Sequence, residues 1–164
     1  MKNKSVKPIP EGYHSLTTFI MATDAHKLSD FLKKAFNAKE KSIHLTPDGK
    51  IMHAEIVIGD SILMLSEGNE RYPSQPAMVY LYTEDVDGFY KKAIAAGAVS
   101  LREPTDEFYG DRSAGIKDPS GNQWWIATHI EDVSPDEMKK REEEWTKQQQ
   151  QEQQQQNKQQ QKES

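Results

Sequence analysis

The chain contains no cysteine. None of its 164 residues can form a disulfide bond, a thiolate zinc site or a cysteine nucleophile. An excess of basic charge is also missing, because 21 Lys and Arg residues stand against 26 Asp and Glu residues and the net charge is −5. Binding to the phosphate backbone of nucleic acids requires basic side chains, so we expect no nucleic-acid partner.

Long hydrophobic runs are absent as well. No stretch reaches the roughly 20 apolar residues that a membrane-spanning helix requires. The first ten residues are polar and lack the apolar segment of a signal peptide. We therefore expect no membrane association and a cytoplasmic location.

The first half of the chain has the pattern of a strand, a helix and three more strands. Asp24 is placed to cap the helix, whose apolar residues recur at helical spacing. Pro47-Asp48-Gly49 is a sequence typical of a hairpin turn. The expected elements are a strand over 13–21, a helix over 25–36, and strands over 39–45, 50–58 and 61–66.

The second half repeats this order. A helix is capped near Glu84-Asp85 and ends before Gly97, and Asp118-Pro119-Ser120-Gly121 predicts a turn before the last strand. An internal repeat of this length indicates a fold built from two similar units. The sequence thus predicts an α+β domain of two βαβββ repeats. The expected strands are 78–82, 98–101, 111–116 and 123–128.

These patterns divide the chain into a folded unit and polar ends. We expect a domain over 12–130, with repeats over about 12–68 and 76–129, and a flexible N-terminus over 1–11. Ser134, Pro135 and Glu137 predict a short helix within 131–146. Residues 147–164 are almost all Gln, Lys and Glu, so we expect a disordered tail. Self-association through the glutamine run is an alternative.

Three segments resemble the glyoxalase/bleomycin-resistance/dioxygenase superfamily, whose fold is called the vicinal oxygen chelate fold. They are IMHAEIVIGDS at 51–61, YGDRS at 109–113 and KDPSGNQW at 117–124. The resemblance is closest to the glyoxalase-like group of phosphonate operons and extends from about Gly12 to His129. It implies a cup-shaped mixed sheet with the helices outside, and a homodimer in which half-cups pair across subunits.

Strand alternation predicts which side chains line the cup. Neighbouring side chains in a strand point to opposite faces, so aliphatic residues such as Leu16 and Ile20 should mark the helix-packed face. His53 and Glu55 should then project into the cup. Arg112 is expected to approach it from the equivalent strand of the second repeat. The remaining candidate ligand-binding residues are Thr17, Phe19, Met64, Met78, Tyr80, Tyr82, Tyr109 and Trp125.

The resemblance also implies where a metal would be held. Metal-dependent members place one His or carboxylate ligand on each of the first, fourth, fifth and eighth strands. The corresponding positions here are Thr17, Met64, Met78 and Trp125. None of these is a good ligand for a divalent cation, so we expect no metal site and no cofactor.

His53 and Glu55 form the strongest polar pair expected in the cup. They suit a general base and the carboxylate that orients it, with Arg112 holding an anionic substrate. The favoured alternative is a hydrogen-bonded network that fixes the strands. For Tyr80, Tyr82, Tyr109 and Trp125, packing in the core or a dimer interface and ligand stacking explain the residues equally well.

These expectations favour a metal-free small-molecule-binding protein over an enzyme. Its ligand would be planar or partly apolar, because the expected cup is aromatic, rich in methionine and poor in polar groups. The alternative is a lyase or isomerase that uses His53 and Glu55 for proton transfer, or an ion bound at a displaced site.

The four positions that correspond to metal ligands lead to a prediction. Purified protein should carry no stoichiometric zinc, nickel, manganese or iron when its metal content is measured by elemental analysis. About one tightly held metal ion per chain, lost in a His53→Ala variant, would contradict this prediction.

Overall fold

The structure is a computed structural model that describes residues 6–160. The outermost residues of the expected N-terminal and C-terminal segments, 1–5 and 161–164, lie outside this range. The first half of the chain forms β1 (Phe19–Ala22), α1 (Ala25–Phe36), β2 (Lys39–Leu45), β3 (Ile51–Ile58) and β4 (Ser61–Glu67). The second forms β5 (Met78–Tyr82), α2 (Val86–Ala95), β6 (Val99–Asp106), β7 (Asp111–Lys117) and β8 (Gln123–His129), followed by α3 (Pro135–Gln160).

Each half forms its own four-stranded mixed sheet, and the two sheets have the same topology. The strand orders are β1-β4-β3-β2 and β5-β8-β7-β6, with the first and last strands of each half parallel. The register repeats too, since Phe19 pairs with Met64 in the first sheet and Tyr80 pairs with Trp125 in the second. The α+β fold of two βαβββ repeats expected from the sequence is confirmed.

Local sequence explains where the first two helices begin and end. Asp24 accepts a hydrogen bond from the Lys27 backbone N–H at 2.9 Å, and Asp85 accepts one from that of Gly88 at 2.8 Å. These caps satisfy N–H groups that have no partner within the helix. At the other end of α1, Asn37 takes a left-handed conformation with φ 53°, which ends the helix.

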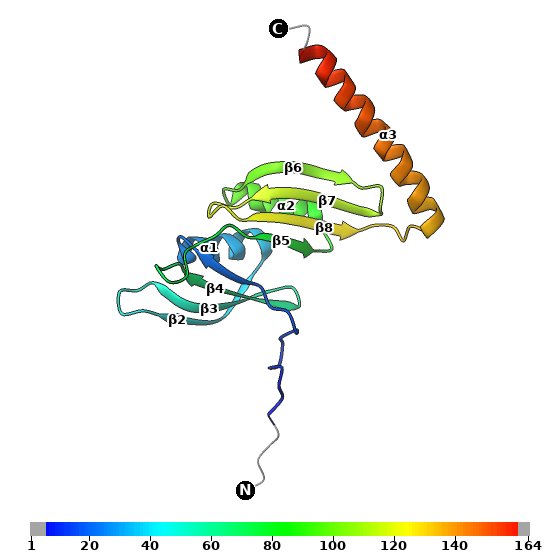
Figure 1. Ribbon diagram of the computed structural model, residues 1–164. Helices are drawn as coiled ribbons and strands as arrows, with labels where there is room; N and C mark the ends of the chain where they lie inside the picture. The colour runs from blue at the N-terminus through cyan, green and yellow to red at the C-terminus, as the bar shows by residue number, and fades with distance from the viewer. Residues whose placement is uncertain (1–5, 161–164) are drawn as a thin grey trace.

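The two halves share one hydrophobic core. Phe36, at the end of α1, packs against Trp124 of β8 with ring centroids 4.9 Å apart and stacks on Phe89 of α2 at 6.1 Å. In Figure 1 the two sheets are separate, with α1 lying between them. Because the helix-packed faces of both sheets contribute to this core, the opposite face of each sheet, which we call its cup face, points outward.

Strand alternation agrees with the structure in most strands and fails in one segment. Ile56, Leu65 and Ile126 are buried in the shared core, as expected for the helix-packed face. Leu16 was expected there too, but its side chain is 92% exposed. The reason is that β1 begins only at Phe19 and a bend at residues 15–16 interrupts the alternation.

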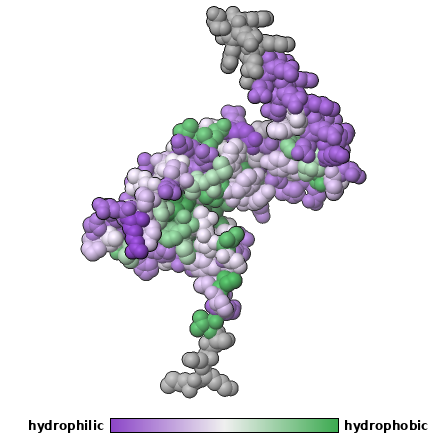
Figure 2. Space-filling view, viewed as in Figure 1, coloured by the Kyte–Doolittle hydropathy of each residue, from purple (hydrophilic) through white to green (hydrophobic). Residues whose placement is uncertain are grey.

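The helix α3 is longer than the sequence indicated. It continues from Pro135 through the glutamine-rich segment to Gln160, so residues 147–160 are helical where disorder was expected. Gln, Glu and Lys have favourable helix propensities, and a helix can propagate through them without burying a face. Figure 2 shows hydrophilic surface along this helix. The first part of this helix is anchored, because Arg141 bonds both Glu131 oxygens at 2.8 Å and Trp145 packs on Phe108.

The anchoring of α3 predicts how truncations behave. Removing residues 147–164 should change the melting temperature by less than about 2 °C, because residues 147–155 are exposed and bury almost no apolar area. Removing residues 134–164 should lower it measurably, since Arg141 and Trp145 are lost. Thermal unfolding followed by circular dichroism measures both. A large loss of stability after removal of residues 147–164 would show that the outer part of α3 packs on the protein.

Candidate functional site

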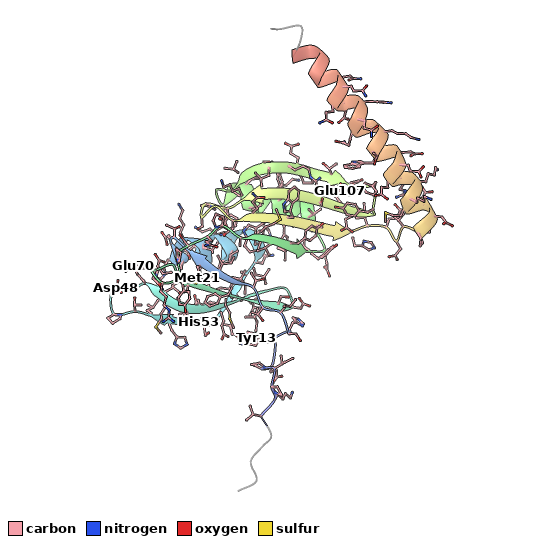
Figure 3. The ribbon with its side chains drawn as sticks, viewed as in Figure 1. Tyr13, Met21, Asp48, His53, Glu70 and Glu107 are labelled. Atoms are coloured by element: carbon pink, nitrogen blue, oxygen red, sulfur yellow. The ribbon has the colours of Figure 1, made fainter. Side chains whose placement is uncertain are left out.

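The cup face of the first sheet is covered in part by the N-terminal segment. Phe19 of β1, His53 and Glu55 of β3, and Met64 of β4 belong to this face. Figure 3 shows Tyr13 where the N-terminal segment reaches the sheet, and His53 on the side away from the second sheet. A cavity of about 580 Å³ lies between the segment and the sheet, lined by Pro8, Ile9, Pro10, Tyr13, His14, Ser15, Thr17, Lys41, Glu55 and Met64.

Glu55 is the centre of the polar contacts on this face. Its carboxylate forms an ion pair with Lys41 Nζ at 2.9 Å, and Lys41 Nζ lies 4.4 Å from the centroid of the Tyr13 ring. Hydrogen bonds from Tyr13 and then Lys41 lower the pKa of Glu55 below its ordinary value. His53 Nε2 is 3.9 Å from Glu55 Oε1, which is too long for a hydrogen bond. Glu55 therefore binds Tyr13 and Lys41 and does not orient the His53 ring.

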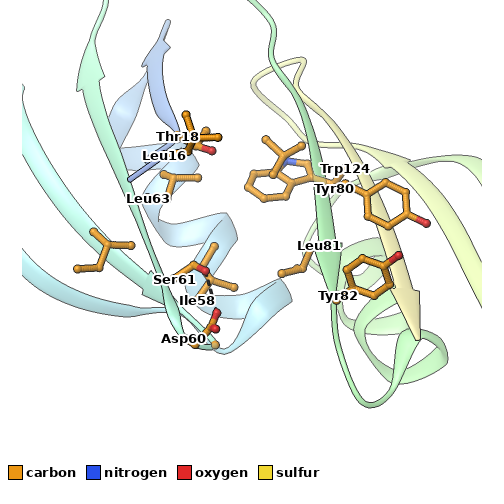
Figure 4. Close-up of a pocket in the computed structure, with 13 residues that line it drawn as sticks. Leu16, Thr18, Ile58, Asp60, Ser61, Leu63, Tyr80, Leu81, Tyr82 and Trp124 are labelled. Carbon is orange, nitrogen blue, oxygen red and sulfur yellow. Dashed lines mark hydrogen bonds between the residues drawn. The ribbon is translucent and has the colours of Figure 1, made fainter. Parts of the chain in front are cut away.

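The cup face of the second sheet is aromatic. Tyr80 and Tyr82 of β5 lie with ring centroids 5.2 Å apart, and Figure 4 shows them on the side of the strand opposite Leu81 and Trp124. Burial, together with a hydrogen bond involving Tyr109, raises the pKa of Tyr80 far above its ordinary value. The expected residues Met78, Tyr80, Tyr82, Tyr109 and Trp125 are thus assembled in one half of the chain.

A glycine in β7 allows Trp125 to lie on this face. Gly115 pairs with Trp125 across β7 and β8, and a Cβ atom at position 115 would lie 3.0 Å from the ring. That distance is shorter than ordinary van der Waals contact, so a larger residue would push the indole away. Gly115 therefore keeps the Trp125 ring close to the sheet.

A hydrogen-bonded chain behind the tyrosines was not identified from the sequence. Asp111, 4% exposed, accepts a hydrogen bond from the Tyr82 hydroxyl at 2.9 Å and contacts His129 Nδ1 at 2.7 Å. His129 Nε2 lies 3.0 Å from Asp132 Oδ1. Hydrogen bonds to Asp111 and then to Asp132 raise the pKa of His129 above its ordinary value. The sequence could have indicated the contact between Asp111 and His129, because a hairpin of β7 and β8 places these two residues opposite each other.

Arg112 does not reach the cup face, and this expectation was wrong. Its guanidinium forms ion pairs at 2.7 Å with Asp87 of α2 and with Asp106. The cause is the alternation of β7, in which the buried core residues Ala114 and Ile116 share the side of Arg112. The guanidinium on the cup face belongs instead to Arg102 of β6, which lies 4.8 Å from the Trp125 ring and pairs with Glu107.

The family of the chain follows from its match to known proteins. Residues 14–126 match the model of the Glyoxalase/Bleomycin resistance protein/Dioxygenase superfamily. The chain belongs to this superfamily. Uncharacterized proteins of Mycobacterium bovis and Mycobacterium tuberculosis are 30% identical to it over 136 residues, which cover 76% of this chain and 90% and 80% of those relatives.

Solved structures of other proteins share the fold. TioX from Micromonospora sp. ML1 matches with a TM-score of 0.63 at 24% identity, covering 71% of this chain and 99% of TioX. TnmS3 from Streptomyces sp. CB03234, described as an antibiotic binding protein, matches with a TM-score of 0.58 at 20% identity, covering 71% and 95%. The superfamily expected from the sequence is confirmed, whereas membership of the phosphonate-operon group stays a prediction.

The four positions that the family resemblance assigns to metal ligands hold a threonine, two methionines and a tryptophan. Met64 and Trp125 lie at equivalent places in the two sheets, Met78 begins β5, and Thr17 precedes β1. Within residues 6–160, no group of three or more His, Cys, Asp or Glu side chains is arranged to hold a metal ion. In the same range, no helix is long and apolar enough to cross a membrane.

The contact between Asp111 and His129 predicts a raised pKa for the His129 imidazole. The His129 pKa should lie above 6.5 and should fall toward that value in Asp111→Asn, because the lost carboxylate stabilises the imidazolium. Nuclear magnetic resonance of the imidazole protons measures both midpoints. Asp87→Asn, which removes the same charge near α2, is the control and should leave the midpoint unchanged.

The raised pKa of His129 also predicts how the stability of the fold changes with pH. A pKa that is higher in the folded state stabilises the fold below the unfolded pKa, and this contribution is lost as pH rises through the folded pKa. The wild type should therefore exceed His129→Gln in stability by more at about pH 5 than at about pH 9. A difference that grows with pH would contradict the assignment.

Proposed function

We propose that this protein is a homodimer that binds a small molecule without a metal ion. Each binding cup would combine the first sheet of one subunit with the second sheet of the other. The observation that carries the proposal is the outward direction of the two cup faces within one chain. Large apolar side chains remain exposed there, with Phe19 at 52%, Met78 at 70%, Tyr80 at 48% and Tyr82 at 63%.

Large apolar side chains that are exposed in one chain are expected to be buried against another molecule. Contiguous apolar patches on a protein surface mark sites of interaction with other molecules. A twofold axis would bring the first sheet of each subunit opposite the second sheet of its partner, so two equivalent cups form at once. This arrangement covers both exposed faces with a single type of contact.

The chemistry of the two faces supports a planar or partly apolar ligand. Tyr80 and Tyr82 present ring faces for stacking, and Trp125 lies beside them with the Arg102 guanidinium over its ring. Glu55, Lys41 and Tyr13 supply polar groups on the opposing face. TnmS3, a fold neighbour described as an antibiotic binding protein, supports the choice of a small molecule. A cytoplasmic location stays part of this proposal.

The lyase or isomerase alternative receives less support. It requires His53 to act as a base that Glu55 orients through a hydrogen bond. The 3.9 Å separation of these side chains and the pairing of Glu55 with Lys41 do not provide that hydrogen bond. For this reason, proton transfer by His53 and Glu55 ranks second to ligand binding as a proposed function.

The dimer leads to a prediction about oligomeric state. Light scattering at micromolar concentration should give the mass of two chains, and Phe19→Asp and Tyr82→Asp should each weaken dimerisation by about tenfold or more, because each buries a charge in the interface. Ile94→Asp is the control, since Ile94 is a 37% exposed apolar residue on α2 and not on a cup face. A wild-type monomer, or equal effects of all three variants, would contradict the proposed interface.

A further inference from the structure

The tyrosines of the second cup face form an open corner of ring faces. The planes of Tyr80 and Tyr82 are inclined by 50° at a centroid distance of 5.2 Å. The face of an aromatic ring carries negative electrostatic potential and attracts a cation placed within about 6 Å of its centroid. Tyr82 also donates a hydrogen bond to Asp111, which increases the electron density of its ring. This corner therefore favours positive charge.

The groups behind the corner have a surplus of negative charge. Asp111 and Asp132 both contact His129, so two carboxylates face a single imidazole. The cluster is negative whether His129 is neutral or protonated. Asp111 is buried, and a buried charge interacts more strongly with a nearby ligand than an exposed one does. The cluster adds to the attraction that the rings exert on a cation.

Three positive side chains near the cup faces have carboxylate partners. Arg102 pairs with Glu107 beside Trp125, and Lys41 pairs with Glu55 on the first sheet. Arg141, at the start of α3, binds Glu131 and Glu137. Each of these three cations is offset by its own carboxylates, so Arg102, Lys41 and Arg141 do not offset the surplus charge of the Asp111 cluster.

We infer that the ligand of the cup is an organic cation, an ammonium group that lies against the ring faces of Tyr80 and Tyr82 with Asp111 behind them. The rest of the ligand is aromatic or apolar and lies toward Trp125. This inference deepens the proposed function and rests on the dimer that closes the cup. It assigns to Asp111 a role in recognition, because its carboxylate selects the charge of the ligand.

Three probes that share a benzene ring test the charge preference. Benzyltrimethylammonium, benzyl alcohol and benzoate carry one positive charge, no charge and one negative charge. We expect the cation to bind the wild-type dimer at least about fivefold more tightly than the alcohol, and benzoate to bind most weakly. Binding is measured by calorimetry and by the shift of the Trp125 indole proton resonance.

The outcomes separate this inference from the proposed function. Equal affinity for the cation and the alcohol, or no binding of the cation, overturns the inference and leaves the dimer in place. A monomer by light scattering overturns the dimer itself. Binding of all three probes to the dimer with a preference for benzoate would point to an anionic ligand and would also overturn the inference.

Substitutions of Tyr80 test whether its ring face binds the cation. Tyr80→Leu should weaken binding of the cation by about threefold to tenfold, whereas Tyr80→Phe, which keeps the ring, should restore most of it. Tyr80 is 48% exposed, so neither change threatens the core. Equal losses in both variants would show that the ring face is not what binds the cation.

A second pair of variants tests the carboxylate. Asp111→Asn should reduce the preference for the cation over benzyl alcohol by about fivefold or more. Asp87→Asn removes the same charge on the helix side, where Asp87 binds Arg112, and should leave the preference unchanged. Equal effects of the two variants would mean that only the net charge of the protein matters, and the assignment to Asp111 would fail.

Discussion

The packing of Phe36 against Trp124 and Phe89 is the contact on which the arrangement of the protein depends. It joins the end of α1 to the sheet and the helix of the other half. Phe36 and Trp124 are 2% and 1% exposed, and truncating a buried aromatic residue of this kind costs about 3–5 kcal/mol. Because the halves meet through their helix-packed sides, both cup faces are left on the outside of one chain.

The turn that carries part of the family resemblance serves this contact and not the cup. In the Asp118-Pro119-Ser120-Gly121 turn, Asp118 Oδ1 accepts hydrogen bonds from the backbone N–H groups of Ser120 and Asn122. Its Oδ2 accepts hydrogen bonds from the Asn122 side chain and from the Trp124 indole. The buried carboxylate is thus fully hydrogen-bonded, and it orients the Trp124 ring toward Phe36. The motif identifies the fold because it stabilises the core, and it says little about the ligand.

The sequence was sufficient for features that depend on neighbouring residues and insufficient for those that depend on distant ones. Alternation predicted the faces of β3, β4, β5 and β8, and capping residues predicted the start of each of the first two helices. Arg112 was misplaced because the alternation of β7 was not applied to it, although Ala114 and Ile116 indicate its side. The outward direction of the cup faces could not be read in this way, because it depends on Phe36 meeting Phe89 and Trp124 from the other half.

The two repeats have diverged at equivalent positions on their cup faces. Glu55 pairs with Met64 in the first sheet just as Gly115 pairs with Trp125 in the second, so the carboxylate and the glycine are equivalent. A side chain at the glycine position would displace the indole, which means that only the second sheet can present this flat aromatic surface. In the proposed dimer each cup combines one polar half with one aromatic half. A ligand with a cationic end and an apolar ring would then take a single orientation, with its ring toward Trp125 and its charge against Tyr80 and Tyr82.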